Sequence, residues 1–326
     1  MSEIFYSQAI CAALREELAR DPSVYLLGED IAGYGGAFRV TRGLAEEFGP
    51  ERVRNTPISE NSIAGVAVGS AMLGMRPVVE IMFMDFITLA IDQIFNHAAK
   101  FRFMFGEQVR LPLVIRTPSG GRRGYGPTHS QCLESLFMSM PGIKIAAPST
   151  PHDAKGMLKA AIRDDNPVLF VENKSLYGMR GEVPDGDYTV PLGSAQVLRE
   201  GGDVTIISYS QMVHECLRAA ETLAAEGVSA EVIDLRTLNP LDMDTLCASL
   251  EKTGRVVLAE EGHRTGGVCA EIGFRLLEKL YYYLEAPIKR VAALDTPVPA
   301  APVLERYVLP DHTNVVQAVR EVLSED

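Results

Sequence analysis

The chain lacks several features that would assign it to a broad class of protein. Its 326 residues carry a formal net charge of −12, so it lacks the basic surplus that is typical of nucleic-acid binders. The five cysteines form no Cys-x-x-Cys pair, which argues against a disulfide framework and against a zinc site. The opening MSEIFYSQAI has no secretory pattern, and no apolar run reaches the roughly 18 residues of a membrane helix. We therefore expect a cytoplasmic protein that binds neither nucleic acid nor membrane.

What the chain does have is enough apolar sequence for two cores, since 47% of its residues are hydrophobic. Short apolar runs alternate with helical patterns, which predicts an α/β fold with two parallel-sheet domains. Composition shifts at GEVPDGDYTVPLG (181–193), so we expect one domain over 1–185 and another over 186–326. The expected helices span 4–20, 62–74, 86–105, 151–164, 211–226, 243–252, 266–284 and 311–324. The expected strands span 23–30, 52–59, 76–83, 111–117, 142–148, 167–173, 203–210, 230–237 and 255–261.

A glutamate stands at the start of an uncharged segment of small and apolar residues. It closes NTPISE (55–60) and begins the spacing E-x-x-x-x-G-V-x-x-G, which is filled by Glu60, Gly65, Val66 and Gly69. The two glycines lie about one helical turn apart, so they leave a groove that another backbone can approach. Taken alone, the glutamate also fits an ordinary helix start, where a carboxylate meets the positive end of the helix dipole.

The spacing resembles the glutamate motif of thiamine-diphosphate enzymes. From about residue 4 to the C-terminus, the chain resembles the beta subunit of the decarboxylating first component of 2-oxoacid dehydrogenase complexes, a relative of transketolase. The matching pieces, whose order and spacing make the resemblance specific, are LGEDIAGYGG, NTPISE, GMRPVVEIMFMDF, DQIFNHAAKF, THSQ, PSTPHDAKGMLKAAIRDDNPVLFVEN, EVIDLRTLNPLD and VPAAPVLERYVLP. The resemblance implies a transketolase-like pyrimidine-binding domain followed by a transketolase C-terminal-like domain.

By the same resemblance, Glu60 faces a ring nitrogen of the thiamine aminopyrimidine. Burial disfavours the charged form of a carboxyl group, so Glu60 can share a proton with that ring and favour the tautomer that activates the cofactor. Phe86 packs against the ring, Met82 lines the same pocket, and Ile58 touches it. Met82 and Phe86 also fit the role of ordinary core residues, and for Met82 the two interpretations are evenly balanced.

A glycine-rich loop, PSGGRRGYGPTHS (118–130), ends close to His129. The resemblance makes His129 a catalytic residue that positions substrate and the lipoyl group and assists proton transfer, a role that suits an imidazole with a pKa near neutrality. Arg122 and Arg123 either attract an anionic substrate or are solvated, and we favour solvation.

The segment AAIRDDNP (160–167) presents oxygen ligands at the end of a helix. The resemblance implies a monovalent cation such as potassium, held by carbonyl groups of Leu113, Ala161, Ile162 and Asp164 together with Asn166. The same residues also fit ordinary helix capping before Pro167.

One motif of the wider enzyme class is absent. Thiamine enzymes hold the cofactor's diphosphate through magnesium with a Gly-Asp-Gly and a later Asn, and this chain contains no Gly-Asp-Gly. The resemblance therefore implies an alpha subunit that holds magnesium and the diphosphate, in a heterotetramer of two alpha and two beta subunits. It also implies that the C-terminal domain supports the contact between beta subunits and binds a lipoyl-bearing acyltransferase core.

The resemblance implies an enzyme subunit that is active only with its alpha partner. The expected reaction is decarboxylation of a small 2-oxo acid, with pyruvate first, and transfer of the acyl unit to the lipoyl group. Acetoin dehydrogenase and branched-chain 2-oxoacid dehydrogenase remain alternatives. A non-catalytic scaffold is the alternative from another class, and the joint presence of Glu60, Phe86 and His129 argues against it.

Overall fold

The computed structural model describes residues 1–324, and the chain divides into two compact units. The first comprises Met1–Ser119 and Leu136–Leu192, and the second comprises Gly120–Ser135 and the chain from Gly193 onward. The structure thus groups 120–135 with the second unit, whereas the sequence analysis assigns this segment to the first domain. The domain boundary at 185/186 stays a prediction about the two functional domains.

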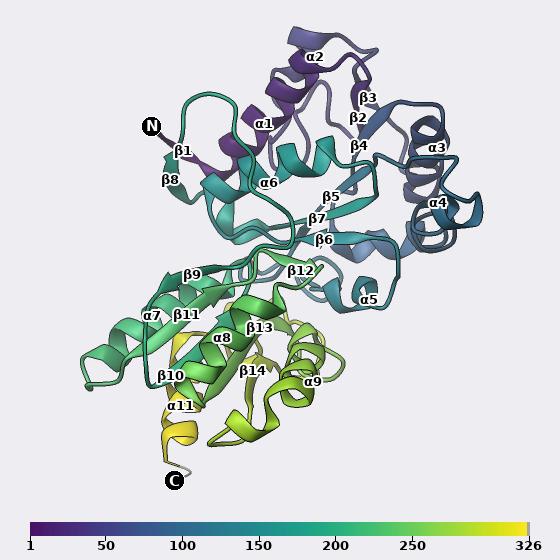
Figure 1. Ribbon diagram of the computed structural model, residues 1–326. Helices are drawn as coiled ribbons and strands as arrows, with labels where there is room; N and C mark the ends of the chain where they lie inside the picture. The colour runs from purple at the N-terminus through teal and green to yellow at the C-terminus, as the bar shows by residue number, and fades with distance from the viewer. Residues whose placement is uncertain (325–326) are drawn as a thin grey trace. The chain divides into compact units, whose positions relative to one another are not determined.

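The first unit is built on a parallel sheet whose strands lie in the order β6-β7-β5-β4-β2-β3 (Figure 1). Its strands are mostly buried apolar runs, as expected where both faces of a parallel sheet are covered. They are β2 (Val24–Gly28), β3 (Val53–Asn55), β4 (Arg76–Glu80), β5 (Val114–Ser119), β6 (Lys144–Ala146) and β7 (Val168–Asn173). A separate antiparallel pair joins β1 (Ser2–Phe5) to β8 (Arg180–Val183). The sequence does not predict this pair, since residues 4 and 5 continue the helical pattern of 4–20.

Helices cover the sheet of the first unit. Helices α1 (Tyr6–Arg20) and α6 (Pro151–Arg163) pack side by side and share one hydrophobic core with the sheet (Figure 1). α6 begins where the sequence suggests, because Thr150 accepts a hydrogen bond from the Asp153 backbone N–H and Pro151 occupies the first turn. The remaining helices outside 84–104 are α2 (Leu44–Phe48), α3 (Glu60–Met72) and the 3₁₀ turn η3 (Lys174–Leu176).

The prediction of one long helix over 86–105 is wrong. The structure has a 3₁₀ helix η1 (Met84–Ala90), a π-helix η2 (Gln93–Ala98) and a short α4 (Phe101–Met104). The reason lies in the burial pattern: Met84, Ile87 and Ala90 are all fully buried at a spacing of three, which matches the three residues per turn of a 3₁₀ helix. Burial on the core side therefore outweighs the α-helical pattern of the sequence.

The second unit has its own five-stranded sheet, with the strand order β14-β13-β10-β11-β9. Its strands are β9 (Gln196–Arg199), β10 (Val204–Ser208), β11 (Ala230–Asp234), β13 (Val256–His263) and β14 (Lys289–Ala293), and the short β12 (Thr237–Asn239) of this unit is not part of the five-stranded sheet. Its helices are α7 (Met212–Ala224), α8 (Met243–Thr253), α9 (Val268–Leu280), η4 (Tyr281–Tyr283), α10 (Pro302–Val308) and α11 (His312–Leu323). α5 (Glu134–Met138) lies where the chain returns to the first unit. The sequence predicts β10, β11, β13 and the long helices, and it does not predict β9, β12, β14 and α10.

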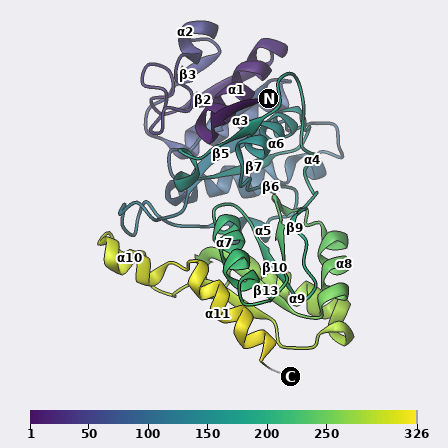
Figure 2. The ribbon, with the colours of Figure 1, turned by 90° about the vertical axis from the view of Figure 1, so that its left-hand side faces the viewer.

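Alternating residues of β10 show how helices cover both faces of this sheet. Val204 and Ile206 belong to the core formed with α7 and α11, whereas the Thr205 hydroxyl is 2.7 Å from both the Ser249 and Thr253 hydroxyls on α8. Successive side chains of a strand point to opposite faces, so α7 and α11 lie on one face and α8 on the other. Figure 2 shows this arrangement around β10. The expected pair of α/β domains with parallel sheets is confirmed, with β9 as an antiparallel edge strand.

Within the described residues 1–324, none of the helices combines the length and the hydropathy needed to cross a membrane.

Candidate active site

The candidate site lies at one edge of the first unit's sheet. Because β2, β3 and β4 run parallel, their carboxyl ends meet at the same edge, where ligands of open α/β sheets commonly bind. Glu29 follows β2, the segment 56–60 follows β3, and the segment 81–86 follows β4. The topology therefore brings Ile58, Glu60, Met82 and Phe86 to one edge, as the resemblance implies.

Glu60 is the first residue of α3 and is buried, with 7% of its surface exposed. The helix places this carboxyl group at its positive end, where an acidic side chain is favoured. α3 packs against η1, and the Asn61 amide donates a 3.5 Å hydrogen bond to the Leu89 carbonyl oxygen at the end of η1. The helix start that carries Glu60 is thus held against the segment that carries Phe86.

Glu29 is a second acidic residue at this edge, and its pKa is affected by Glu60. Burial raises the pKa of Glu29, and the charges of Glu60, Asp30 and Glu80 raise it further. The charge of Glu60 therefore acts on Glu29, although no sequence motif singled out Glu29. The available signal was its place directly after a buried strand.

The apolar candidates differ in exposure. Met82 and Phe86 are half-buried, whereas Ile58 is 83% exposed. The Phe86 ring lies edge-on to Phe83, with a centroid distance of 6.0 Å, and Phe83 lies edge-on to Phe38 at 5.6 Å. Such edge-to-face pairs are a preferred aromatic geometry, so Phe86 is anchored by an aromatic cluster and not by isolated core packing. The sequence analysis missed Phe38 and Phe83.

The glycine groove of α3 is partly filled and partly open. A Cβ at Gly65 would lie 3.4 Å from the Gln93 side-chain oxygen, whereas a Cβ at Gly69 would meet no atom within 4 Å. Val66 on α3 and Leu73 at its C-cap are 59% and 88% exposed. α3 therefore presents a small, apolar surface that another chain can approach closely.

His129 belongs to the second unit, unlike the other four candidates. It is half-buried, and its Nδ1 lies 3.0 Å from the Thr128 hydroxyl. The preference for a solvated Arg122 is wrong: this side chain is largely buried and donates a hydrogen bond of 2.5 Å to the Pro310 carbonyl oxygen. Arg123 is exposed, as expected. The correction arises because Pro310 is close to Arg122 only in the folded unit.

The five candidate cation ligands lie in the first unit, near the amino ends of the parallel strands. Each oxygen accepts a hydrogen bond within the chain: Leu113 from Val168 N, Ala161 from Asp164 N, Ile162 and Asp164 from the Arg76 guanidinium, and the Asn166 side chain from Arg102. A carbonyl oxygen has two lone pairs, so one accepted hydrogen bond does not by itself exclude a cation, although the charged Arg76 guanidinium already binds two of these oxygens. Among the described residues, no cluster of three or more His, Cys, Asp or Glu side chains has the geometry to hold a metal ion.

A buried ionic network under the candidate edge was not predicted from sequence. Arg116 on β5 donates two hydrogen bonds to Glu172, of 2.7 and 2.9 Å, and a third of 2.8 Å to Glu80. The Tyr177 hydroxyl donates to Glu172 at 2.8 Å. Glu80 is the last residue of β4, so this network holds the strand end from which the segment 81–86 departs.

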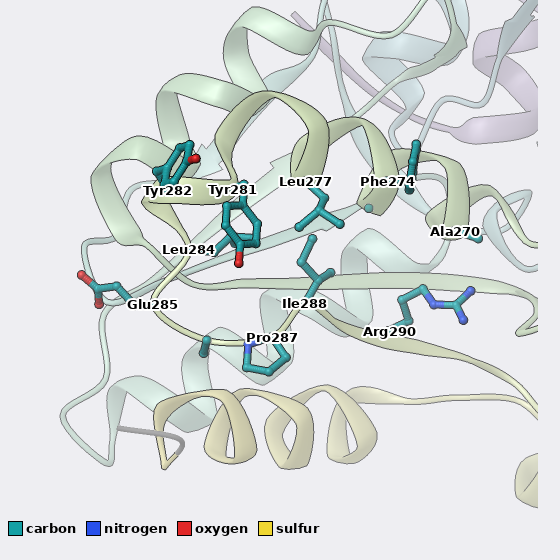
Figure 3. Close-up of a pocket in the computed structure, with 12 residues that line it drawn as sticks. Ala270, Phe274, Leu277, Tyr281, Tyr282, Leu284, Glu285, Pro287, Ile288 and Arg290 are labelled. Atoms are coloured by element: carbon teal, nitrogen blue, oxygen red, sulfur yellow. The ribbon is translucent and has the colours of Figure 1, made fainter.

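The second unit contains a separate groove of about 860 Å³ beside α9 (Figure 3). Phe274, Leu277 and Tyr281 line one side, and Leu284, Pro287 and Ile288 line the other, with Arg290 and Glu285 towards opposite ends. This lining is mostly apolar and aromatic, which suits a contact surface better than an acid–base site.

Family comparisons match both parts of the chain. Residues 2–180 match the model described as transketolase, pyrimidine binding domain, and residues 193–315 match transketolase, C-terminal domain. The chain is 47% identical over 324 residues to the 2-oxoisovalerate dehydrogenase subunit beta of Bacillus subtilis, covering 99% of each chain. The chain belongs to the transketolase-like family of 2-oxoacid dehydrogenase beta subunits.

Other relatives of this family carry different names. The chain is 47% identical to the mitochondrial pyruvate dehydrogenase E1 component subunit beta-1 of Arabidopsis thaliana, covering 97% of this chain and 88% of that one. It is 46% identical to the acetoin:2,6-dichlorophenolindophenol oxidoreductase subunit beta of Cupriavidus necator, covering 97% and 96%. A solved structure titled split gene transketolase, inactive beta4 tetramer, aligns with a TM-score of 0.80 at 28% identity and covers 98% of each chain.

Proposed function

We propose that this chain is the beta subunit of a thiamine-diphosphate-dependent 2-oxoacid dehydrogenase with pyruvate as its preferred substrate. In this proposal it acts with an alpha subunit to decarboxylate the 2-oxo acid and to acylate the lipoyl group of an acyltransferase. The observation that carries the proposal is the buried Glu60 carboxyl group at the strand edge that also holds Met82 and Phe86.

The residues at this edge fit the pyrimidine half of thiamine diphosphate. A buried carboxyl group at a helix start can hold a proton at a ring nitrogen, and a half-buried aromatic ring can pack against a flat heterocycle. When bound, the cofactor supplies the carbanion chemistry that decarboxylation requires. Glu60 would hold the proton, Phe86 and Met82 would orient the ring, and the exposed Ile58 would be covered by the cofactor or by the partner chain.

His129 would act on substrate and lipoyl group. Histidine side chains commonly transfer protons in enzymes, and the position of His129 after a glycine-rich loop suits contact with a group that must enter and leave. This assignment rests on the family motif GPTHS.

Substrate choice within the family rests on a few pocket contacts. Relatives named for 2-oxoisovalerate, pyruvate and acetoin are 44–47% identical to this chain, so overall similarity does not separate the substrates. Each contact discriminates by about 1–3 kcal/mol, and an alpha subunit would supply part of the pocket. Acetoin and branched-chain 2-oxo acids are therefore the alternative substrates, and a non-catalytic scaffold is disfavoured by the retained Glu60, Phe86 and His129.

The proposed alpha subunit would complete the site. This chain has no Gly-Asp-Gly sequence for a magnesium-bound diphosphate, so the partner would hold both groups in an assembly of two alpha and two beta chains. The open surface of α3 around Gly69 offers a place for close contact with another chain. Cytoplasmic localisation stays a prediction, since relatives include proteins named mitochondrial.

The decisive experiment compares the purified chain with a co-expressed alpha and beta pair. The pair should bind thiamine diphosphate in a magnesium-dependent way. It should decarboxylate pyruvate faster than it cleaves acetoin or decarboxylates branched-chain 2-oxo acids. The lone chain should show neither cofactor binding nor turnover. Magnesium-dependent turnover by the lone chain would contradict the split site, and faster reaction of another substrate would contradict the choice of pyruvate.

A monovalent cation at Leu113, Ala161, Ile162, Asp164 and Asn166 is a further part of the proposal. Binding of potassium to the native state alone would stabilise it by about 2.7 kcal/mol at a hundred times the dissociation constant. Thermal unfolding of the chain in potassium chloride and in choline chloride of equal ionic strength tests this. Equal melting temperatures over a wide range of concentrations would contradict a specific site.

A further inference from the structure

The loop that leads to His129 adopts an unusual backbone. Gly120, Arg122, Gly124 and Gly126 all have positive φ angles, of 86°, 69°, 69° and 76°. Glycine adopts this region freely, but for Arg122 it is unfavourable, and such a conformation persists only where its surroundings impose it. The contacts around the loop therefore identify what imposes it.

Two buried carboxylates hold the loop by its backbone. Glu261 on β13 accepts a hydrogen bond of 2.7 Å from the Gly121 N–H, and Glu305 on α10 accepts from the Gly124 N–H at 3.1 and 3.2 Å to its two oxygens. Glu261 and Glu305 are only 6% and 4% exposed. Hydrogen bonds to a charged acceptor shielded from water are stronger than neutral ones, so these are firm attachments.

Arg122 makes the third attachment. Besides its hydrogen bond to Pro310, its guanidinium lies 3.7 Å from Glu261 and 3.8 Å from Glu215 on α7. Burial tends to raise the pKa of Glu215, but hydrogen bonds from Arg218 and Gln211 and the charge of Arg122 lower it overall. Glu215 therefore stays ionised at neutral pH and faces Arg122 as an anion.

Packing leaves the loop little room to shift. A Cβ at Gly121 would lie 2.7 Å from a Leu309 methyl carbon, and a Cβ at Gly124 would lie 3.1 Å from the Ala300 carbonyl oxygen. Gly124 thus permits both a positive φ angle and a close approach to the segment around α10, whereas Gly121 permits the close approach alone. The loop therefore packs closely against the segment 300–310.

We infer that Glu215, Glu261 and Glu305 are positioning residues, which hold the loop 120–126 in the conformation that presents His129. The inference rests on the proposed role of His129 in acyl transfer. His129 follows the last loop glycine by three residues, and its backbone N–H donates to the Gly126 carbonyl oxygen at 3.4 Å, so the loop path sets the position of the imidazole. Four glycines without these attachments would sample many conformations, and few of them would place His129 for reaction.

The test uses the assembled enzyme with Glu261→Ala and Glu305→Ala, measured one at a time. Loss of a hydrogen bond to a charged group changes an equilibrium constant by about tenfold to hundredfold. Hydrogen exchange should therefore become faster by that factor at Gly121 in Glu261→Ala and at Gly124 in Glu305→Ala, and the rate of lipoyl acylation should fall by a similar factor in each variant. Affinity for thiamine diphosphate should change less than twofold.

Two further variants separate positioning from general damage. Glu305→Gln keeps an oxygen that accepts from Gly124, so it should restore most of the acylation lost in Glu305→Ala. Glu226→Ala removes a carboxylate that pairs with Arg320 elsewhere in the same unit, so it should leave loop exchange and acylation unchanged.

The outcomes are distinguishable from failure of the proposed function. Unchanged exchange at Gly121 and Gly124 would overturn the attachment of the loop, and faster exchange with normal acylation would overturn its positioning role. His129→Ala, measured in parallel, checks the premise. If His129→Ala lowers acylation but the glutamate variants do not, the inference alone fails; if His129→Ala has no effect, the proposed role of His129 fails with it.

Discussion

Replacing Arg116 by methionine should leave two buried carboxylates of the first unit without their cationic partner. Arg116 is buried and is the cation to which both Glu80 and Glu172 bind, through three hydrogen bonds of 2.7–2.9 Å. Burial raises the pKa of Glu80; the charge of Arg116 lowers it, the charge of Glu172 raises it, and the net shift is upward. The network thus already carries one carboxylate more than its single arginine balances.

The magnitude follows from what the methionine leaves behind. Removing one partner of a buried ion pair costs about 3–5 kcal/mol, because the remaining charge loses its compensation and stays away from water. At about 2–4 °C per kcal/mol for a unit of this size, the melting temperature should fall by about 6–20 °C. Circular dichroism can follow thermal and urea unfolding of the purified chain, and hydrogen exchange of the β4 and β5 amides reports on the strands that carry the network.

Control variants test whether the loss of stability is caused by the buried carboxylates that have lost their cationic partner. Arg116→Met combined with Glu80→Gln and Glu172→Gln removes both carboxylates and should recover most of the lost stability. Glu80→Gln alone leaves the balanced Arg116–Glu172 pair and should change stability by less than about 1 kcal/mol or increase it. A cost below 1 kcal/mol for Arg116→Met, or a triple variant no more stable than the single one, would refute the reasoning.

Three further predictions concern the catalytic residues and pH. Glu60→Gln should leave the fold intact but slow hydrogen–deuterium exchange at the thiazolium carbon of bound cofactor by about 10²–10⁴-fold, and exchange at the wild-type rate in an assembled enzyme would contradict its role. His129→Ala should lower lipoyl acylation far more than affinity for thiamine diphosphate, as titration and acylation assays can show; normal acylation with weakened cofactor binding would mean that His129 is misassigned. Because the folded-state pKa of Glu215 is lowered by the hydrogen bonds of Arg218 and Gln211 and by the charge of Arg122, its contribution to stability should be present above about pH 4.5 and lost as pH falls below that value. Protection of the loop amides, measured relative to their intrinsic exchange rate at each pH, should therefore fall on acidification in the wild type, where His312 and Glu261 also face the cluster, and Glu215→Gln should remove most of this dependence.

Much of the candidate site could be predicted because parallel topology is readable in the sequence. Apolar runs such as RPVVEIMF and PVLFVEN, separated by helical patterns, indicate parallel strands, and parallel strands end at the same edge. The segments around Glu60 and Phe86 therefore had to come together once the strand order was known. Their chemical roles came from the family motif and not from the periodicity.

Other local features could not be predicted because their causes lie in distant parts of the chain. The segment 86–105 has a helical pattern, yet the core takes Met84, Ile87 and Ala90 at a spacing of three and imposes a 3₁₀ helix. Short strands such as β9 and β14 carry weak patterns of their own, and their pairing with β11 and β13 defines them.

The sequence by itself determined the family, the two α/β domains and the sheet edge at which Glu60 and Phe86 lie, since these depend on motifs and on the order of apolar runs. Only the tertiary structure decided the environment of the charged residues. The sequence GGRRGYG predicts a solvated Arg122, whereas the folded unit buries most of its side chain. In the sequence, Glu80, Arg116 and Glu172 are three separate charges in three separate strands. Their partners are 36 to 188 residues away along the chain, and a polar contact over such a separation exists only after folding has removed water and brought the partners together.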